Sequence, residues 1–438
     1  MWKPLLACLL SLTGPVAAQA PDLAALLAAA VDQPTALARA AAAEILAARK
    51  DVSLDAWLEA MQGFEANPAL RPVREGSKQV ELIVAGSSER TELCWYVPDD
   101  LALGSPVPLL VGMHPTGGNG PGAIREWRRV ADDWGAILLA PSEAGPNVGF
   151  AATARERESV LAAIRWARRH WNIDENRIAL AGFSRGAHMA WDLALRHPSQ
   201  FCAIVPVSGA PRFELARGAA NLRYLENLRS TAVYSLIGRH DQEGLVWTAL
   251  ECFRRLDELE APLAKLVVDE QAGHMPDRSG AEFGVFLAGA QRNPDPESLV
   301  RLYAHAGEGR AAWLEVLEGT KPTEEVFRPT IRATKHKQLD DDGLRRFLVD
   351  ATAKHTGRIQ LKRDNPGRYS GKHVGIKRFR ILIEQEHLPE DGRIVAKLAN
   401  KRLRATVKAD PAVLLKEFVE HFDRTFLPVA EAHFQTKR

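Results

Sequence analysis

Between residues 76 and 290 the sequence alternates short, almost wholly apolar runs with longer stretches that have a helical period. A strand that is apolar at every position must be covered on both faces, which is the situation of strands in a parallel sheet. The apolar runs are VPLLVGMH, GAILLAPS, RIALAGFS, FCAIVPVSG, TAVYSLIG and AKLVVDEQ. Two earlier runs, KQVELIVAG and RTELCWYVP, are expected to form an antiparallel pair. The pattern therefore predicts an α/β fold with a mostly parallel, doubly wound sheet.

Two segments of different composition flank this α/β domain. Residues 21–75 are rich in alanine and carry apolar residues at helical spacing, so we expect two or three short helices whose role is packing. Residues 291–438 begin with two runs that we expect to be helical, PESLVRLYA and RAAWLEVLEG. Strand-like runs, a helix and a last strand follow. These features predict a smaller α+β or β-sandwich-like accessory domain after the α/β domain.

The first twenty residues place Lys3 before an apolar run, and Ala18-Gln19-Ala20 fits a small-residue cleavage site. This pattern is typical of a signal peptide spanning residues 1–20, and it predicts a secreted or periplasmic protein. No later stretch approaches the roughly 18 apolar residues of a membrane span. Cleavage would leave Cys94, Cys202 and Cys252, an odd number that argues against a disulfide-built scaffold. One disulfide among the three is left open.

The stretch ALAGFSRGAH, residues 179–188, ends a predicted strand and begins a predicted helix. Ser184 lies at the corner between Gly182 and Gly186. One interpretation is that Ser184 caps the helix while the glycines shape the turn. The other is a G-x-S-x-G nucleophile elbow, which exposes the serine hydroxyl at the edge of the sheet. The second interpretation requires a histidine to take the hydroxyl proton and a carboxylate to orient that histidine.

Both partners occur after Ser184, each just past the end of a predicted strand. Asp241 follows the strand TAVYSLIG, and His274 follows the next strand in the loop QAGHM. The order Ser, Asp, His is the one expected when the nucleophile follows a G-x-S-x-G elbow in an α/β sheet. We therefore predict that Ser184, Asp241 and His274 are the catalytic residues. The substitutes for the acid are Glu243 and Asp269, and the rival base is His240.

A tetrahedral oxyanion needs two preorganised N–H donors. The first is expected to be the backbone N–H of Arg185, directly after the nucleophile. The second is expected from the loop His114-Pro115-Thr116-Gly117-Gly118, where proline has no N–H and Thr116 is the best candidate. The residues expected to line the substrate site are His114, Gly117, Trp247 and Met275.

Residues 78–290 resemble the α/β-hydrolase fold. The nearest resemblance is to secreted esterases of the dienelactone-hydrolase, feruloyl-esterase and polyhydroxyalkanoate-depolymerase-like groups. It is carried by NIDENRIALAGFSRGAHMAWDLALRHPSQFCAIVPVSGAP, which is similar to their elbow strand, elbow helix and next strand. Two departures are His114-Pro115, where many relatives have His-Gly, and Ala187, where many have a second glycine.

The resemblance implies a carboxylic ester hydrolase that works through an acyl-enzyme on a small-molecule or polymer-borne ester. It implies the same roles for Ser184, Asp241 and His274, and the same oxyanion donors. The first alternative is a serine peptidase of the prolyl-oligopeptidase type. The second is a non-catalytic protein that binds polyanions on a hydrolase scaffold.

The sequence contains no phosphate-binding loop and no zinc pattern, so neither a cofactor nor a metal is expected. The net charge of +2 indicates no nucleic-acid partner. This balance conceals a basic C-terminal part, because residues from Lys321 onward include 26 Lys and Arg against 16 Asp and Glu. Such clustering attracts polyanions, and an anionic polysaccharide is the partner considered. The alternative is that these charges only solubilise exposed strands.

Overall fold

A computed structural model provides the structure of the chain. It describes residues 22–67, 70–84, 87–142, 153–212, 221–261, 263–305, 307–320, 330, 332, 336 and 338–436. The predicted signal peptide, residues 1–20, lies outside the described residues. Within the described ranges, no helix is both long enough and apolar enough to cross a membrane.

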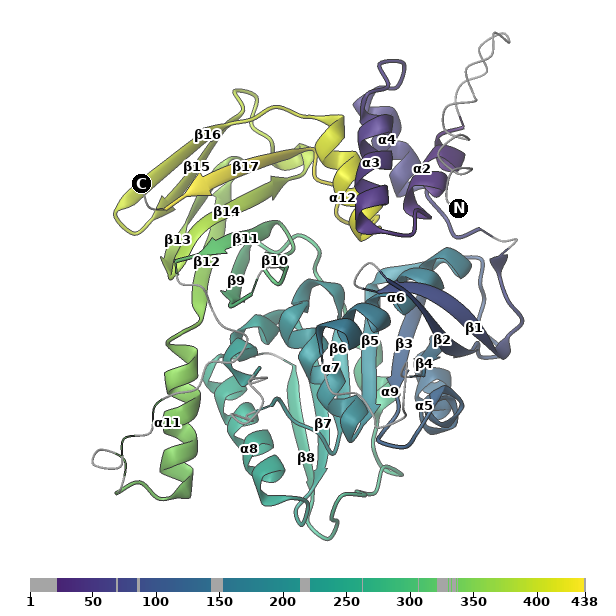
Figure 1. Cartoon of the computed structure of the whole chain (residues 1–438), viewed down its shortest axis with the longest axis vertical. Helices are drawn as coiled ribbons and strands as arrows, with labels where there is room; N and C mark the ends of the chain where they lie inside the picture. Colours follow the sequence, from purple (N-terminus) through teal and green to yellow (C-terminus); the bar gives the residue numbers. More distant parts are fainter. Residues whose placement is uncertain are drawn as a thin grey trace.

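The eight-stranded sheet of the α/β domain has the order β1-β2-β4-β3-β5-β6-β7-β8 (Figure 1). Strand β2 pairs antiparallel with β1 and β4, and every other pair is parallel. The predicted fold class, a mostly parallel sheet of the α/β-hydrolase kind, is therefore confirmed. The strands are β1 (Glu75–Val84), β2 (Ser87–Tyr96), β3 (Val107–Met113), β4 (Ile137–Pro141), β5 (Ile173–Phe183), β6 (Ala203–Val207), β7 (Ala232–Gly238) and β8 (Ala264–Asp269).

Helices cover both faces of this sheet, as the apolar strands require. Alternate residues of β3 show the two layers. Leu109 and Val111 belong to the core beneath α6, α7 and α8, whereas Leu110 belongs to the core beneath α5 and α9. The helices are α5 (Gly120–Trp134), α6 (Ala154–His170), α7 (Arg185–Arg196), α8 (Glu243–Glu258) and α9 (Phe283–Ala288), with the short 3₁₀ helices η2 (Pro198–Gln200) and η3 (Leu222–Ser230).

The three cysteines Cys94, Cys202 and Cys252 are buried and unpaired, so they form no disulfide with one another. Burial raises the pKa of Cys94 and of Cys202 to about 12. A thiol with so high a pKa stays protonated near neutral pH and acts as a small core residue.

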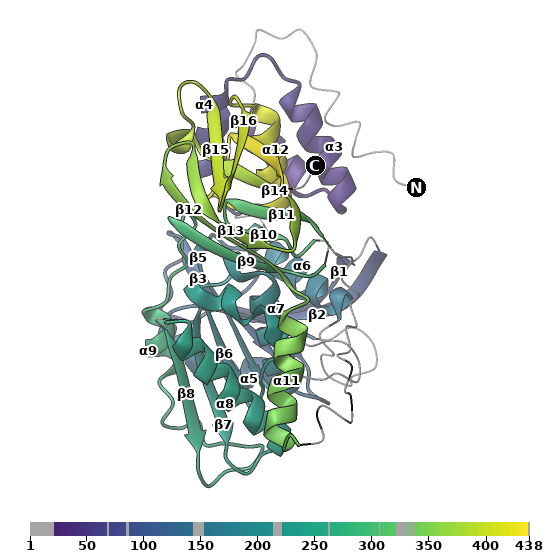
Figure 2. The same cartoon turned by 90° about the vertical axis from the view of Figure 1, so that its left-hand side faces the viewer.

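The accessory domain is built from two small sheets that share one apolar core (Figure 2). One sheet has the order β16-β15-β13-β12-β9 and the other β10-β11-β14-β17. Helix α11 (Asp341–Ala353) extends from the sheets along the α/β domain beside α8. The strands are β9 (Ser298–Tyr303), β10 (Arg310–Ala311), β11 (Leu314–Gly319), β12 (Gly357–Asn365), β13 (Arg368–Val374), β14 (Ile376–Ile383), β15 (Arg393–Leu398), β16 (Lys401–Thr406) and β17 (Ala430–Gln435), with a 3₁₀ turn η4 (Gln385–His387).

The prediction that PESLVRLYA and RAAWLEVLEG are helical was wrong, because these runs form β9, β10 and β11. Strand β9 is covered on both faces. Tyr303 packs in the core of the accessory domain, while Leu302 packs in a core of the α/β domain. A strand buried on both sides shows no alternation of polar and apolar residues, so its period alone resembles that of a buried helix.

The N-terminal helices α2 (Leu23–Val31), α3 (Ala36–Ala47) and α4 (Leu54–Gln62) pack against α12 (Pro411–His421), close to the other end of the chain. Their shared core includes Leu27, Trp57, Leu414 and Phe418. The segment predicted at 21–75 therefore forms its helices, and it packs with the last helix of the accessory domain.

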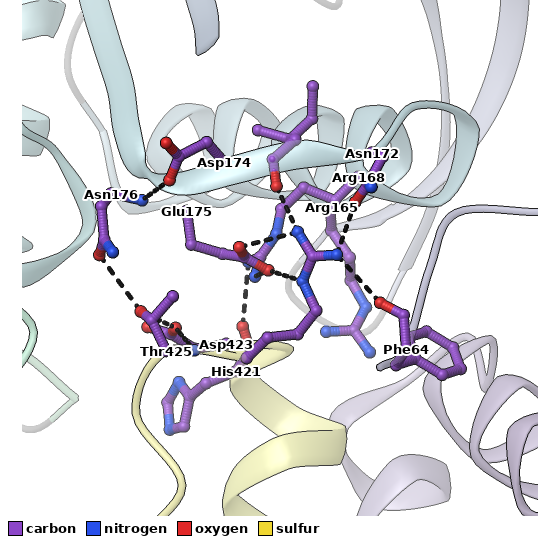
Figure 3. Close-up of polar contacts among 12 residues, drawn as sticks. Phe64, Arg165, Arg168, Asn172, Asp174, Glu175, Asn176, His421, Asp423 and Thr425 are labelled. Carbon is purple, nitrogen blue, oxygen red and sulfur yellow. Dashed lines mark hydrogen bonds and ion pairs between the residues drawn. The ribbon is translucent and has the colours of Figure 1, made fainter. Parts of the chain in front are cut away.

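An arginine-rich junction joins the loop after α12 to the α/β domain (Figure 3). Arg424 donates two hydrogen bonds to the carboxylate of Glu175, at 2.6 and 2.9 Å. It also donates to the Phe64 carbonyl at 3.0 Å and to Asn172 Oδ1 at 2.5 Å. Arg168 of α6 donates to Glu175 from the other side, at 3.3 Å. One guanidinium thus joins residues from three segments that are far apart in the sequence.

Two further arginines complete this junction. Arg292 donates to both carboxylate oxygens of Asp423, at 2.6 and 3.2 Å. Arg165 donates to the carbonyls of Val31, Val419 and Glu420 at 2.7–2.9 Å. These carbonyls lie at the C-terminal ends of α2 and α12. The last carbonyls of a helix receive no hydrogen bond from an N–H group of the same helix. Arg165 therefore ties both helix ends to α6.

Candidate active site

Ser184 lies in a sharp turn between β5 and α7. Its backbone has φ 54° and ψ −116°, a conformation that is uncommon for a residue with a side chain. Glycine is required on both sides of the turn. A Cβ on Gly182 would lie 2.2 Å from the carbonyl carbon of Gly186, and a Cβ on Gly186 would lie 2.1 Å from the Met113 carbonyl oxygen. The two glycines let strand and helix approach closely enough to hold Ser184 at the corner.

The side chain of Ser184 makes no capping hydrogen bond to α7, so the capping interpretation is wrong. Instead, Ser184 Oγ lies 2.9 Å from His274 Nε2. On the other side of the ring, His274 Nδ1 lies 2.9 and 3.1 Å from the two carboxylate oxygens of Asp241. The structure thus brings the three predicted residues into one hydrogen-bonded line at the carboxyl edge of the parallel strands.

The carboxylate of Asp241 is held in a fixed position. Its side chain is only 2% exposed, and one oxygen accepts the N–H of Gln242 at 2.7 Å. The loops that carry the acid and the base cross closely, because a Cβ on Gly238 would lie 2.0 Å from the carbonyl oxygen of Gly273. The ring of His274 is 43% exposed. The carboxylate is therefore shielded from water, while the imidazole remains open to a substrate.

The substitute residues have other contacts. Glu243 pairs with Arg345 of α11 at 3.1 Å. Asp269 accepts the N–H groups of Asp277 and Gln271, at 2.9 and 3.1 Å, and these hydrogen bonds lower the pKa of its carboxyl. Asp269 therefore shapes the loop that carries the histidine, whereas Asp241 contacts the ring.

Ser208 is a residue of the site that sequence reasoning missed. It directly follows β6 with φ 51°, and its hydroxyl donates to the backbone carbonyl of His274 at 2.9 Å. This hydrogen bond connects the end of β6 to the histidine loop. The sequence feature that could have indicated Ser208 is its position directly after the run FCAIVPV, at the same edge of the sheet as the other site residues.

A row of side chains in contact adjoins the histidine. The ring of Phe183, next to the serine, lies 5.4 Å from the ring of His274. The guanidinium of Arg278 lies 4.6 Å from the centre of the Phe183 ring and pairs with Glu126 of α5. These contacts hold the histidine loop against the body of the α/β domain.

The second oxyanion donor is predicted in the loop after β3. Thr116 and Gly117 are exposed, and Gly117 has φ +73°, which favours glycine. The N–H of Gly118 donates to the Pro115 carbonyl at 3.0 Å and closes the turn. The other predicted donor belongs to Arg185, the first residue of α7, so its N–H lies at the helix N-terminus next to Ser184. The departure at Ala187 is accommodated by Gly209, where a Cβ would lie 2.4 Å from the Ala187 Cβ.

The prediction that His114 lines the substrate site is not supported by its position. The side chain is 1% exposed, and its Nδ1 donates to the Pro115 carbonyl at 2.8 Å. Burial lowers the pKa of His114, which keeps the ring neutral. Its role is to shape the loop that carries Thr116.

The other two predicted lining residues differ in exposure. Met275 is 68% exposed, next to the histidine. Trp247 is half-buried, packs on a core of the α/β domain, and lies 5.6 Å from the guanidinium of Arg345. Helix α11 of the accessory domain therefore covers part of the surface that follows the acid.

Two observations concern a metal site and a cavity elsewhere in the molecule. Among the described side chains, no group of three or more His, Cys, Asp and Glu has an arrangement that could hold a metal ion. A cavity of about 870 Å³ lies at the arginine-rich junction, and none of the three aligned residues lines it.

Comparison with known proteins gives matches to hydrolases. The family model of X-Pro dipeptidyl-peptidases (S15 family) matches residues 145–214, a stretch that contains Ser184. Feruloyl esterase B of Talaromyces stipitatus is 30% identical over 127 residues, which are 26% of this chain and 35% of the esterase. The chain thus matches about a third of the length of that curated relative.

Similar solved structures include a thermostable esterase, with 20% identity and a TM-score of 0.40, over 50% of this chain and 64% of the other. They also include an esterase of Pyrococcus furiosus, with 19% identity and a TM-score of 0.40, over 51% of this chain and 97% of the other.

Proposed function

We propose that this chain is a serine hydrolase that cleaves carboxylic esters through an acyl-enzyme. The observation that carries the proposal is the line of hydrogen bonds from Asp241 through His274 to the Ser184 hydroxyl. The strained backbone at Ser184 and the lack of a capping role for its hydroxyl support it. A hydroxyl in such a line can lose its proton to the imidazole at the moment of attack.

The reaction proceeds in two halves. His274 Nε2 takes the proton of Ser184 as Oγ attacks the ester carbonyl carbon. The negative charge that develops on the carbonyl oxygen is held by the N–H groups of Arg185 and Thr116. The imidazolium, stabilised by Asp241, then protonates the leaving alcohol, and the acyl group remains on Ser184. A water molecule repeats the sequence and releases the carboxylic acid.

An ester is the favoured substrate over a peptide because the curated relative that matches this chain over 127 residues is named a feruloyl esterase. The second candidate, a serine peptidase, is favoured by the match of residues 145–214 to X-Pro dipeptidyl-peptidases. The two share the mechanism above and differ in the leaving group. Turnover of p-nitrophenyl acetate and feruloyl esters, compared with that of Gly-Pro p-nitroanilide, separates them. Faster turnover of the anilide would reject the esterase proposal.

Replacing the nucleophile tests the mechanism. Ser184→Ala should lower kcat for p-nitrophenyl acetate by on the order of 10⁴-fold or more, because the covalent step needs Oγ. The thermal midpoint should change little, since the hydroxyl makes no capping bond. A fluorophosphonate probe should label the native protein and leave the variant unlabelled. An unlabelled native protein would instead favour the non-catalytic, polyanion-binding alternative.

Secretion is part of the proposal and rests on the first twenty residues alone. Mass spectrometry of protein collected outside the cytoplasm should find the mature chain beginning after Ala20. An N-terminus that retains residues 1–20 in that fraction would contradict cleavage at this site.

A further inference from the structure

One surface of the accessory domain concentrates basic side chains. We call it the basic face and define it by the outward residues of β12, β13, β15 and β16. Successive side chains of each strand point to opposite faces of the sheet. Ile359, Tyr369, Ile394 and Leu403 point into the shared core. The intervening basic residues face outward and are Arg358, Lys362, Arg368, Lys372, Arg393, Lys397, Arg402 and Arg404.

The strand register aligns these charges in rows. Lys362 lies opposite Ser370, Ser370 beside Lys397, and Lys397 opposite Arg402. Neighbouring strands are about 4.8 Å apart, so Lys397 and Arg402 are direct cross-strand neighbours of like charge. Like charges directly opposite one another destabilise a sheet. The arrangement therefore carries a cost to folding that an anionic ligand would remove.

Most of these side chains have no acidic partner. Within the described part of the chain, five of the eight have no ion pair: Arg368, Lys372, Lys397, Arg402 and Arg404. All five are exposed. The other three pair with Glu226, Glu297 and Asp391 at 2.6–3.6 Å. Asp364 is the one acidic residue at an outward position of these four strands, where it accepts a hydrogen bond from Ser370.

The opposite sheet of the same domain shows a different pattern. On β14, Lys377 and Arg378 both pair with Glu318, while Arg380 pairs with Glu315, Glu417 and Glu431. All three basic side chains of β14 therefore have carboxylate partners. The unpaired side chains Arg368, Lys372, Lys397, Arg402 and Arg404 gather on one face, on strands at the end of the molecule remote from the eight-stranded sheet (Figures 1 and 2).

The chemistry of the face indicates the kind of anion. No aromatic side chain points outward from these four strands, so the face lacks the stacking platform typical of single-stranded nucleic-acid sites. Its outward apolar residues are Val374 and Val395, too few for insertion into a lipid interface. Gln360, Ser370 and Thr406 lie between the charges and can hydrogen-bond to hydroxyl groups. Arginine pairs well with carboxylates.

We propose that the basic face binds an acidic polysaccharide whose sugar units carry carboxylates. The cationic rows hold the carboxylates and the neutral polar side chains hold the sugar hydroxyls. This binding is independent of the proposed ester hydrolysis, because no residue of the active site belongs to the face.

The experiment measures binding of sodium polygalacturonate to the full chain by affinity gel electrophoresis at low and high salt. The Ser184→Ala protein is used, so hydrolysis plays no part. The triple variant Lys397→Gln, Arg402→Gln, Arg404→Gln should weaken binding by about tenfold or more, since it removes adjacent cations. The matched control removes three exposed charges elsewhere, at Lys50, Lys78 and Arg90, and should bind like its parent. Dextran, which is neutral, should not bind.

Each other outcome overturns the proposal. No retardation by polygalacturonate at low salt would reject the site. Equal weakening in both triple variants would show that only net charge matters. Tighter binding of duplex DNA or of anionic phospholipid vesicles, lost in the same triple variant, would assign the face to another partner. Misfolding would not obscure the result, because relief of like-charge repulsion should leave the thermal midpoint of the triple variant no lower than that of its parent.

Discussion

At the scale of single residues, backbone geometry decides what the site side chains can do. Ser184 and Ser208 both have positive φ, and each directly follows a parallel strand. Such conformations are held only where surrounding contacts enforce them. For Ser184 the turn aims the hydroxyl at the imidazole. For Ser208 it aims the hydroxyl at the carbonyl of the histidine itself.

Ser208→Ala tests whether this second hydroxyl positions His274. The variant loses one hydrogen bond worth about 1 kcal/mol, so kcat/KM for p-nitrophenyl acetate should fall by about 3- to 10-fold. The matched control is Ser235→Ala, whose hydroxyl donates to the Pro206 carbonyl within the sheet, at 3.3 Å, instead of to the histidine loop. Equal kinetic losses in both variants would mean that Ser208 acts only through general stability.

Ser208→Thr keeps the hydroxyl and should restore part of the lost activity. If the pH dependence of kcat/KM shifts in Ser208→Ala and regains its wild-type position in Ser208→Thr, Ser208 acts on catalysis by positioning the His274 imidazole. A Thr variant as impaired as the Ala variant would contradict this.

At the scale of elements, the first helices that the structure describes pack against its last helix. Helices α2, α3 and α4 bury their apolar faces against α12, so each supplies the other with a core that neither could form alone. This argues that residues 22–62 are an integral part of the fold. A removable pro-segment would leave the apolar residues of α12 exposed.

Two leucine substitutions in the N-terminal helices distinguish these possibilities. Leu27 in α2 is fully buried and Leu37 in α3 is 82% exposed. Leu27→Ala should lower the free energy of unfolding by about 2–5 kcal/mol, because it leaves a cavity in the shared core. Leu37→Ala should change it by less than about 0.5 kcal/mol. Urea unfolding followed by tryptophan fluorescence measures both. An unchanged transition for Leu27→Ala would indicate that these helices are not coupled to the rest.

At the scale of the whole molecule, arginine–carboxylate pairs lie at the junction where the accessory domain meets the α/β domain. The buried carboxyl of Asp423 has its pKa held well below the usual range, by the adjacent Arg292 guanidinium and against the opposing effect of burial. Within the accessory domain, Arg310 and Arg380 likewise hold the pKa of Glu417 at about 2. Buried pairs of this kind become costly when one partner is removed.

These depressed pKa values predict how stability depends on pH. At about pH 4 these carboxyl groups bind protons in the unfolded chain but not in the folded chain. Their contribution to the free energy of unfolding is therefore fully present above that pH. It is lost as the pH falls toward the folded pKa, about 2 for Glu417. Thermal melts between pH 7 and pH 2.5 should therefore show the midpoint falling mainly below pH 4.5.

Asp423→Asn tests the contribution of the junction. At pH 7 it should lower the free energy of unfolding by about 3–5 kcal/mol, because Arg292 is left buried without its counter-charge. The loss should shrink as the pH falls below about 4, since the unfolded wild-type chain then binds a proton at Asp423 that the folded chain does not bind. Glu431 lies at a more open position of the accessory domain, so Glu431→Gln is the milder control. A difference between Asp423→Asn and native protein that is constant with pH would contradict the ion-pair account.

The sequence alone determined the α/β fold class and the order of the three aligned residues. Both depend on local information: the length and period of apolar runs, the glycines around Ser184, and the rule that loops after parallel strands meet at one edge. Asp241 could be preferred over Glu243 and Asp269 only by its place after the strand. The structure shows that the other two carboxylates bind Arg345 and backbone N–H groups.

Tertiary structure decided the rest, because it depends on contacts between residues far apart in the chain. Whether PESLVRLYA is a helix or a strand depended on two cores that cover it from opposite sides. Whether His114 reaches the substrate site depended on the burial of its loop. The same holds for the basic residues after Lys321: their number is a property of the sequence, but which of them find a carboxylate is fixed only when the sheets pack.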